Sequence, residues 1–193
     1  SAPNDSTIDR ELLSDWLLLD LPKVIADGRY WSRPGLFAWN RIDPASALLA
    51  SQLPKNLSGR IADLGAGYGY LAGEVLRNCT GVTAIDTFEA EARALDPARM
   101  NLDLIGKEVG RKVDIEVHWH DVTAGLPHRY DAIVSNPPFH QGRADQPELG
   151  QAFIAAAADA LKPSGSLWMV ANRHLPYEAT LRSRFSEVEA RIL

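Results

Sequence analysis

A short turn containing three glycines joins an apolar strand to a helix, and this junction restricts what the chain can fold into. The apolar run covers residues 61–64, and from Gly69 onward apolar side chains recur at helical spacing. Gly65 and Gly67 lie between them and let a ligand approach the backbone closely at a helix N-terminus. This order of strand, glycine turn and helix predicts the first unit of a parallel α/β sheet.

The chain downstream of this turn alternates between strands and helices. Strands are predicted at residues 82–86, 113–118, 131–135 and 166–171. One intervening helix should be interrupted at Pro97, and an earlier helix should begin after the N-cap Asp43. This alternation predicts a Rossmann-like, doubly wound, mostly parallel sheet with helices on both faces. A strand at 188–193 should lead into a final antiparallel strand, which we expect to be missing from this chain.

The N-terminal segment has a different character. Residues 8–21 carry apolar side chains at helical spacing and predict an amphipathic helix, with Asp5 or Ser6 as its cap. We expect this helix to pack on the rest of the chain or to dock on a neighbour. The chain therefore divides into an N-terminal helical extension, residues 1–27, and one domain, residues 28–193.

The composition fits a single globular domain. With 193 residues, of which 46% are hydrophobic and 23% charged, the chain can bury one sizeable core. There is no apolar run of about 18 residues, so no membrane span is expected. The lone cysteine, Cys79, excludes an intramolecular disulfide and favours the cytoplasm. His118 and His120 lack the further ligands that a zinc site needs, so no metal is expected.

Three acids lie at the ends of predicted strands, where open α/β sheets bind ligands. Asp63 precedes the glycine turn, and Tyr70 stands where a dinucleotide fingerprint would have its third glycine. An acid before the turn can hold an ammonium group, which favours S-adenosylmethionine over NAD as the cofactor. Asp86 could accept hydrogen bonds from both ribose hydroxyls, and Asp121 from the adenine amine.

The peptide Ser135-Asn136-Pro137-Pro138-Phe139 follows the fourth predicted strand of this sheet. The Asn136 side-chain oxygen can accept a hydrogen bond from an amino group, and the prolines hold the carbonyls of the turn in place. Phe139 offers a flat face for a planar base. Two prolines can also simply end a strand. The neighbouring motifs favour a site for an amine on a planar ring.

Together these motifs resemble the class I S-adenosylmethionine-dependent methyltransferases that methylate amino groups. Three stretches are similar to the catalytic domain of bacterial ribosomal RNA guanine-N2 methyltransferases, the small-subunit methyltransferase C type and its large-subunit relatives. They are residues 31–37, 135–142 and 170–177. Trp31 and Pro34 replace the Phe and Asp that are usual in that family. The resemblance covers about residue 28 to the end of the chain.

The resemblance implies an enzyme that transfers a methyl group from S-adenosylmethionine to the exocyclic N2 amine of a guanine in ribosomal RNA. Residues 28–193 would be its methyltransferase catalytic domain. The catalytic residues would be Asn136, Pro137 and Phe139. The cofactor-binding residues would be Asp63, Gly65, Gly67, Asp86, Asp121 and Asn136. The substrate-binding residues would be Pro138, Phe139, His140 and Arg33. Ribosomal RNA or the small ribosomal subunit would be the partner, and an additional methyltransferase-like domain could lie outside this chain.

Two other functions stay open. The same acceptors would serve methylation of adenine N6 or of a protein glutamine amide, although the His140-x-Gly142 extension favours guanine. A non-catalytic, cofactor-binding module would predict loss of the glycine turn or of the Asn-Pro-Pro-Phe sequence, and both are intact. The net charge of −5 is unlike that of most RNA-binding domains, so RNA contact would depend on local arginines or on another domain.

Overall fold

A computed structural model describes residues 9–138, 140–141, 144–145, 147–172 and 176–191. The centre of the fold is a five-stranded sheet. Its strands are β3 (Ser58–Leu64), β4 (Gly81–Glu89), β5 (Asp114–Trp119), β6 (Tyr130–Ser135) and β9 (Leu161–Met169). They lie in the order β5-β4-β3-β6-β9, and all neighbouring pairs are parallel. The order reverses between β3 and β6, and ligands bind open α/β sheets at such a reversal.

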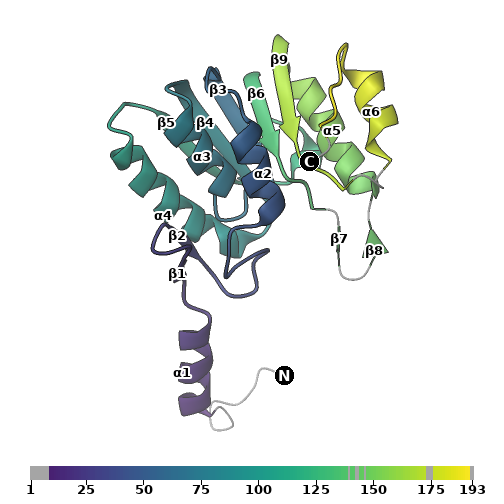
Figure 1. The fold of residues 1–193 in the computed structure, drawn as a ribbon. Helices are drawn as coiled ribbons and strands as arrows, with labels where there is room; N and C mark the ends of the chain where they lie inside the picture. The colour runs from purple at the N-terminus through teal and green to yellow at the C-terminus, as the bar shows by residue number, and fades with distance from the viewer. Residues whose placement is uncertain (1–8, 139, 142–143, 146, 173–175, 192–193) are drawn as a thin grey trace.

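Helices cover both faces of the sheet (Figure 1). On one face lie α2 (Pro44–Gln52), α3 (Tyr70–Asn78) and α4 (Ala92–Glu108). On the other lie α5 (Pro147–Ala160), the short 3-10 helix η2 (Val122–Ala124) and α6 (Tyr177–Arg184). Successive strand residues point to opposite faces, so Ile61 packs in the first core and Ala62 in the second. The predicted doubly wound α/β fold is confirmed.

The N-terminal region reaches the domain through a small hairpin, β1 (Lys23–Ile25) and β2 (Tyr30–Ser32). Tyr30 is buried, and the backbone of Trp31 is held by the Asn101 side chain of α4 at 2.6 and 2.8 Å. Two short strands after β6, β7 (His140–Gln141) and β8 (Ala144–Asp145), form a second hairpin. Figure 1 places both hairpins on the side of the sheet where β6 ends.

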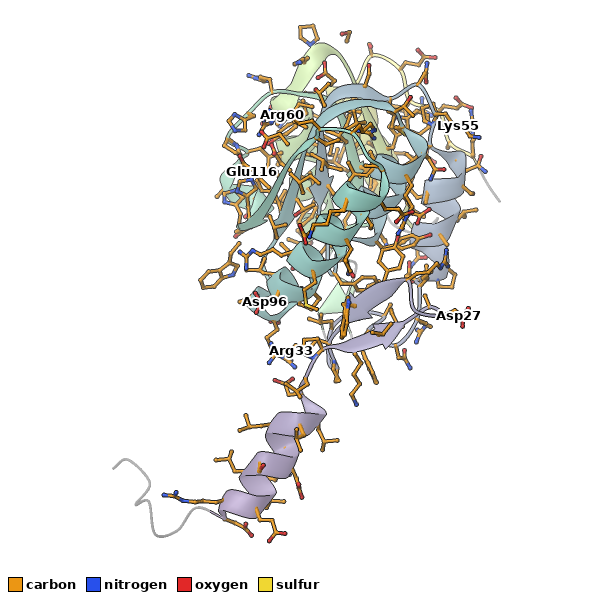
Figure 2. The ribbon with its side chains drawn as sticks, turned by 90° about the vertical axis from the view of Figure 1, so that its left-hand side faces the viewer. Asp27, Arg33, Lys55, Arg60, Asp96 and Glu116 are labelled. Carbon is orange, nitrogen blue, oxygen red and sulfur yellow. The ribbon has the colours of Figure 1, made fainter. Side chains whose placement is uncertain are left out.

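Helix α1 (Arg10–Leu19) projects away from this body, as Figures 1 and 2 show. None of its residues is buried, and Trp16 and Leu17 are each 61% exposed. At its base, Asp20 forms ion pairs with Arg33 and Arg93. The expected packing of this helix on the domain is therefore wrong for the described residues. No helix in the part of the chain that the structure describes is long and apolar enough to cross a membrane.

Several predicted boundaries need correction. Asp9 caps α1 by accepting from the backbone N–H of Leu12 at 3.0 Å, whereas Asp5 and Ser6 lie outside the described residues. Helix α4 continues through Pro97, because one lost backbone bond is offset where the helix is buried against the core. Strand β4 continues past Asp86 to Glu89. Residues 188–191 form no strand, so the prediction of a strand there is wrong.

Candidate active site

The glycine turn between β3 and α3 presents open backbone at the reversal point of the sheet. Gly65 and Gly67 have φ values of 71° and 55°, in the left-handed region that favours glycine. A methyl group on Gly67 would meet no atom within 4 Å. A methyl group on Gly65 would lie 3.8 Å from both the Asn136 carbonyl oxygen and Pro138 Cδ. The turn is thus open at Gly67 and lies against the Asn-Pro-Pro segment at Gly65.

Asp63 lies directly beneath this turn and is completely buried. Its Oδ2 accepts a hydrogen bond from the Ala72 N–H of α3 at 2.9 Å, while its Oδ1 has no partner among the described residues. Burial raises the pKa of Asp63 to about 7, the Ala72 bond opposes this rise, and the nearby Glu89 carboxylate adds to it. A buried carboxylate with an unused oxygen can receive a donor or a cation from a ligand.

Glu89, which the sequence reasoning did not select, lies at the end of β4 beside the glycine turn. Its Oε2 accepts from the Gly67 N–H at 2.7 Å, and its Oε1 from the Glu91 N–H at 2.8 Å. Each oxygen keeps a further lone pair, and Glu89 is half-buried at the carboxyl end of the strand. A strand-end acid in this place can accept hydrogen bonds from ribose hydroxyls.

Asp86, which was predicted for that role, lies within β4 and is completely buried. Arg60 binds both of its oxygens at 2.8 Å, and the Tyr130 hydroxyl donates to Oδ2 at 2.9 Å. The prediction that Asp86 ends the strand is wrong, because Thr87 and Phe88 continue β4 beside β5. Both carboxylate oxygens have a partner inside the protein, and the predicted contact of Asp86 with a ribose stays a prediction that would compete with these bonds.

Asp121 follows β5 and is exposed, as expected for a residue at this edge. Its Oδ1 accepts from the Thr123 N–H at 2.9 Å and from the Thr123 hydroxyl at 2.7 Å. These hydrogen bonds, the one from the hydroxyl first, lower the pKa of Asp121. Oδ2 makes no hydrogen bond within the described part of the chain, so one acceptor stays available.

Asn136 follows β6 directly, across from the end of β3. Its Nδ2 donates to Asp43 Oδ2 at 3.0 Å and to Ser46 Oγ at 2.8 Å, and both partners belong to the start of α2. No donor among the described residues reaches its Oδ1. The Asn136 side chain therefore keeps a free acceptor oxygen.

The backbone of the same segment also leaves the sheet at this point. The last ladder bond runs from the Val170 N–H to the Ser135 carbonyl at 3.2 Å. Beyond it, the Asn136 and Pro137 carbonyls receive no hydrogen bond from any described residue. Pro137 is buried and Pro138 is exposed. Phe139 and the side chain of His140 lie outside what the structure describes.

Arg33 is not free to contact a substrate in this structure. Its Nε donates to the Asp20 carbonyl at 2.9 Å, and its Nη2 forms an ion pair with the Asp20 carboxylate. Figure 2 shows Arg33 at the junction with α1 and Arg60 at the opposite end of the body. The predicted substrate contact of Arg33 therefore stays a prediction that would require the Asp20 pair to open.

One further cluster of acceptors lies between β4 and the edge strand β5. Asp86, Glu116 and His118 place one possible ligand atom each within 4.8 Å of one another. The Asp86 carboxylate is already bound by Arg60 and Tyr130, so a cation would have to compete with an ion pair. His118 instead stacks on Phe88, with ring centroids 4.8 Å apart.

The reversal point thus brings together an open glycine turn, two partly used carboxylates and an acceptor amide at the carboxyl ends of the strands of a doubly wound sheet. This combination is typical of a Rossmann-like domain that binds a nucleoside. Residues 27–192 match the family Methyltransferase small domain, and the chain belongs to that family. The class I methyltransferase fold that the sequence predicts is confirmed.

The chain is similar to curated relatives with a specific name. It is 34% identical over 158 residues to Ribosomal RNA small subunit methyltransferase C of Psychromonas ingrahamii, in an alignment that covers 82% of this chain and 43% of the relative. It is 31% identical over 180 residues to the protein of the same name from Shewanella halifaxensis, with 92% and 50% covered. The chain spans about half the length of these curated relatives.

The chain is also similar to solved structures of methyltransferases. The T. thermophilus 16S rRNA N2 G1207 methyltransferase, in complex with AdoMet and guanosine, is 31% identical and superposes with a TM-score of 0.68, over 86% of this chain and 45% of that chain. An O-methyltransferase from Thermotoga maritima is 20% identical, with a TM-score of 0.53 over 71% of this chain and 47% of that chain, and shares the fold alone.

Proposed function

We propose that this protein transfers a methyl group from S-adenosylmethionine to the exocyclic N2 amine of a guanine in ribosomal RNA. The Asn136 amide is the observation that carries the proposal. Its nitrogen is held by Asp43 and Ser46, its side-chain oxygen receives no hydrogen bond from any described residue, and its backbone carbonyl lies beside the glycine turn at Gly65. The similarity to relatives named for ribosomal RNA methylation supports the substrate class.

The residues at the carboxyl ends of the strands fit S-adenosylmethionine. The open backbone at Gly67 allows a nucleoside to lie close to the turn. Glu89 would accept from the ribose hydroxyls, in place of the predicted Asp86. The unpartnered Oδ1 of Asp63 would receive the ammonium group, directly or through water. Asp121 Oδ2 would accept from the adenine amine. Gly65 has no side chain to fill the space beside Pro138.

The protein's own contribution to the reaction is orientation and charge stabilisation. When bound, S-adenosylmethionine supplies an electrophilic methyl group. The guanine amine is a poor nucleophile because its lone pair is delocalised into the ring. Asn136 Oδ1 and the Pro137 carbonyl would accept its two N–H groups and so direct the lone pair away from the ring plane. The same oxygens stabilise the positive charge that develops on nitrogen, and the proton then leaves to water.

The amine acceptors by themselves also suit adenine N6 or a glutamine amide. Guanine is favoured by the resemblance in the His140-x-Gly142 segment, whose side chains lie outside the described residues. The small ribosomal subunit is the partner that the relatives' names indicate. Because the substrate would be ribosomal RNA, we expect this protein in the cytoplasm.

Nucleoside mass analysis tests this proposal directly. Small-subunit ribosomal RNA is compared between a strain lacking the gene and its parent, and the purified protein is then added to the unmodified subunits with S-adenosylmethionine. We expect N2-methylguanosine to disappear in the deletion strain and to return on addition of the protein. Return of N6-methyladenosine instead, or no methylated nucleoside at all, would contradict the assignment.

A further inference from the structure

The start of α2 is connected to the candidate active site through one side chain. Asp43 is the N-cap of α2, and its Oδ2 accepts both the Ser46 N–H at 2.8 Å and the Asn136 amide at 3.0 Å. The Ser46 hydroxyl accepts the second amide proton at 2.8 Å. Both N–H groups of Asn136 are thereby used by residues that lie 93 and 90 positions earlier in the chain.

The contact with Asp43 fixes which end of the Asn136 amide faces the start of α2. A carboxylate can only accept hydrogen bonds, so the nitrogen of Asn136 and not its oxygen must face Asp43. A flipped amide would place its oxygen 3.0 Å from a carboxylate oxygen and lose the bond to Asp43, although the Ser46 hydroxyl could donate to that oxygen. The anionic partner also polarises the amide and makes its oxygen a stronger acceptor.

The start of α2 is itself held in place, so Asp43 and Ser46 can hold the Asn136 amide in one orientation. Asp43 has an extended backbone and Pro44 occupies the first helical position, which is a stable helix start. Ser46 is only 8% exposed. The Tyr68 hydroxyl, from the glycine turn, donates to the Arg41 carbonyl at 3.1 Å. The turn, the start of α2 and Asn136 therefore form one connected unit.

We propose that Asp43 and Ser46 are positioning residues that hold the Asn136 amide with its oxygen toward the target base. In this orientation the Asn136 oxygen can accept a hydrogen bond from an amine at the edge of the base, but cannot bond to a carbonyl there. The inference rests on the proposed function, because it concerns how Asn136 presents its acceptor during methyl transfer. Neither residue needs to touch the substrate or the cofactor.

Substitutions that keep the helix start test this role. Asp43→Asn retains a good N-cap but offers an NH₂ group that tolerates a flipped Asn136. We expect the single-turnover rate of methyl transfer to fall roughly tenfold or more, since misorientation of a reacting group has effects of this size. Affinity for S-adenosylmethionine and the melting temperature should stay close to those of the wild type. Ser46→Ala should have a smaller effect of the same kind.

Matched controls come from the same chain. Asp9→Asn changes the N-cap of α1, far from the crevice, and Ser51→Ala removes an exposed hydroxyl that bonds within α2 at 2.7 Å. Both should leave the rate unchanged. If Asp43→Asn reacts at the wild-type rate, the positioning role is overturned. It is also overturned if the affinity for S-adenosylmethionine falls by the same factor as the rate.

A double-mutant cycle shows whether Asp43 acts through Asn136. In an Asn136→Ala background, Asp43→Asn should have no further effect on the rate, because there is no amide left to orient. An equal, independent loss in both backgrounds would contradict the inference.

A spectroscopic measurement separates this inference from the proposed function. In the NMR spectrum of side-chain amides, the pair of signals lost in Asn136→Ala identifies that residue without any assay of methylation. We expect both of its protons to exchange slowly in the wild type and faster in Asp43→Asn. If no RNA is methylated but these signals behave as expected, the function fails and the orientation stands. Signals unaffected by Asp43→Asn would overturn the orientation itself.

Discussion

Two groups of buried polar side chains in the parallel sheet are used differently. Towards the middle of the sheet, Arg60 and Tyr130 both bond to the Asp86 carboxylate. At the carboxyl end, Asp63 and Asn136 each keep an oxygen that no described residue reaches. Both regions contain a fully buried carboxylate, Asp86 in one and Asp63 in the other.

The difference separates a structural role from a binding role. Burying a charge is costly unless hydrogen bonds compensate for it, and Asp86 receives that compensation from Arg60 and Tyr130. Among the described residues only Ala72 bonds to Asp63, and burial raises the pKa of Asp63 to about 7. Unused acceptors persist in a stable fold where a ligand satisfies them. We therefore expect changes at the carboxyl end to affect ligands, and changes at Asp86 to affect stability.

Asn136→Ala should give the largest effect on activity. Loss of a preorganised acceptor that acts in the transition state lowers rates by roughly 10²- to 10³-fold. Cofactor affinity, measured by calorimetry, should change little. Asn78→Ala is the control, because that amide is exposed and bonds only within α3. Full activity in Asn136→Ala would remove its oxygen from the mechanism.

Asp86→Asn should instead lower the free energy of unfolding. It removes the carboxylate that binds the Arg60 guanidinium at 2.8 Å and leaves the weaker ion pair with Asp114 at 4.0 Å. Because Arg60 is partly exposed, the loss should be about 2 kcal/mol. Urea unfolding measures this change. Cofactor affinity of the folded protein should match the wild type. A large loss of affinity for S-adenosylmethionine without a loss of stability would show that Asp86 binds the cofactor.

Glu89→Gln should weaken S-adenosylmethionine binding by about tenfold, as expected when an ionised hydrogen-bond acceptor becomes neutral. Glu91→Gln is a matched control, since Glu91 is a neighbouring acid that caps α4. Calorimetry of both variants checks the expectation. Equal affinity in the two variants would show that the end of β4 does not hold the ribose.

Asp63 should give cofactor binding a modest pH dependence. Its buried carboxyl stays protonated up to a pKa of about 7, and a cationic ligand favours the ionised form. Affinity should therefore rise with pH and level off above 7, by roughly fourfold between about pH 6.5 and about pH 8. Asp63→Asn should remove this dependence, and a persisting dependence would assign it to another group.

The same proton acts in the opposite direction on the stability of the cofactor-free protein. The unfolded chain loses it near the ordinary value of 3.8, whereas the folded chain keeps it to about 7. Between these values the folded state binds more protons, so this contribution to stability falls as the pH rises and is constant above 7. Melting curves of wild type and Asp63→Asn should diverge in that window.

The sequence predicted those features that depend on local pattern. The glycine turn, the parallel sheet and the positions of Asp63 and Asn136 follow from periodicity and from short motifs. The helix start at Asp43 was also predicted and is confirmed. Each of these requires only neighbouring residues to be known.

Features that depend on distant partners were missed. The alternation of apolar residues did not show that β4 continues to Glu89, because Thr87 and Phe88 suit a strand as well as its end. The Arg60–Asp86 pair and the Arg33–Asp20 pair join separate segments, so no local pattern shows them. The contact between Asp43 and Asn136 spans 93 positions for the same reason.

A crystal structure of this chain with S-adenosylhomocysteine and guanosine would show what Asn136 and Glu89 bind. We expect the ribose on Glu89, and the exocyclic guanine amine within about 3 Å of Asn136 Oδ1, with Asp86 still bound to Arg60. A nucleoside bound at Asp86, or a guanine with its carbonyl toward Asn136, would contradict this expectation.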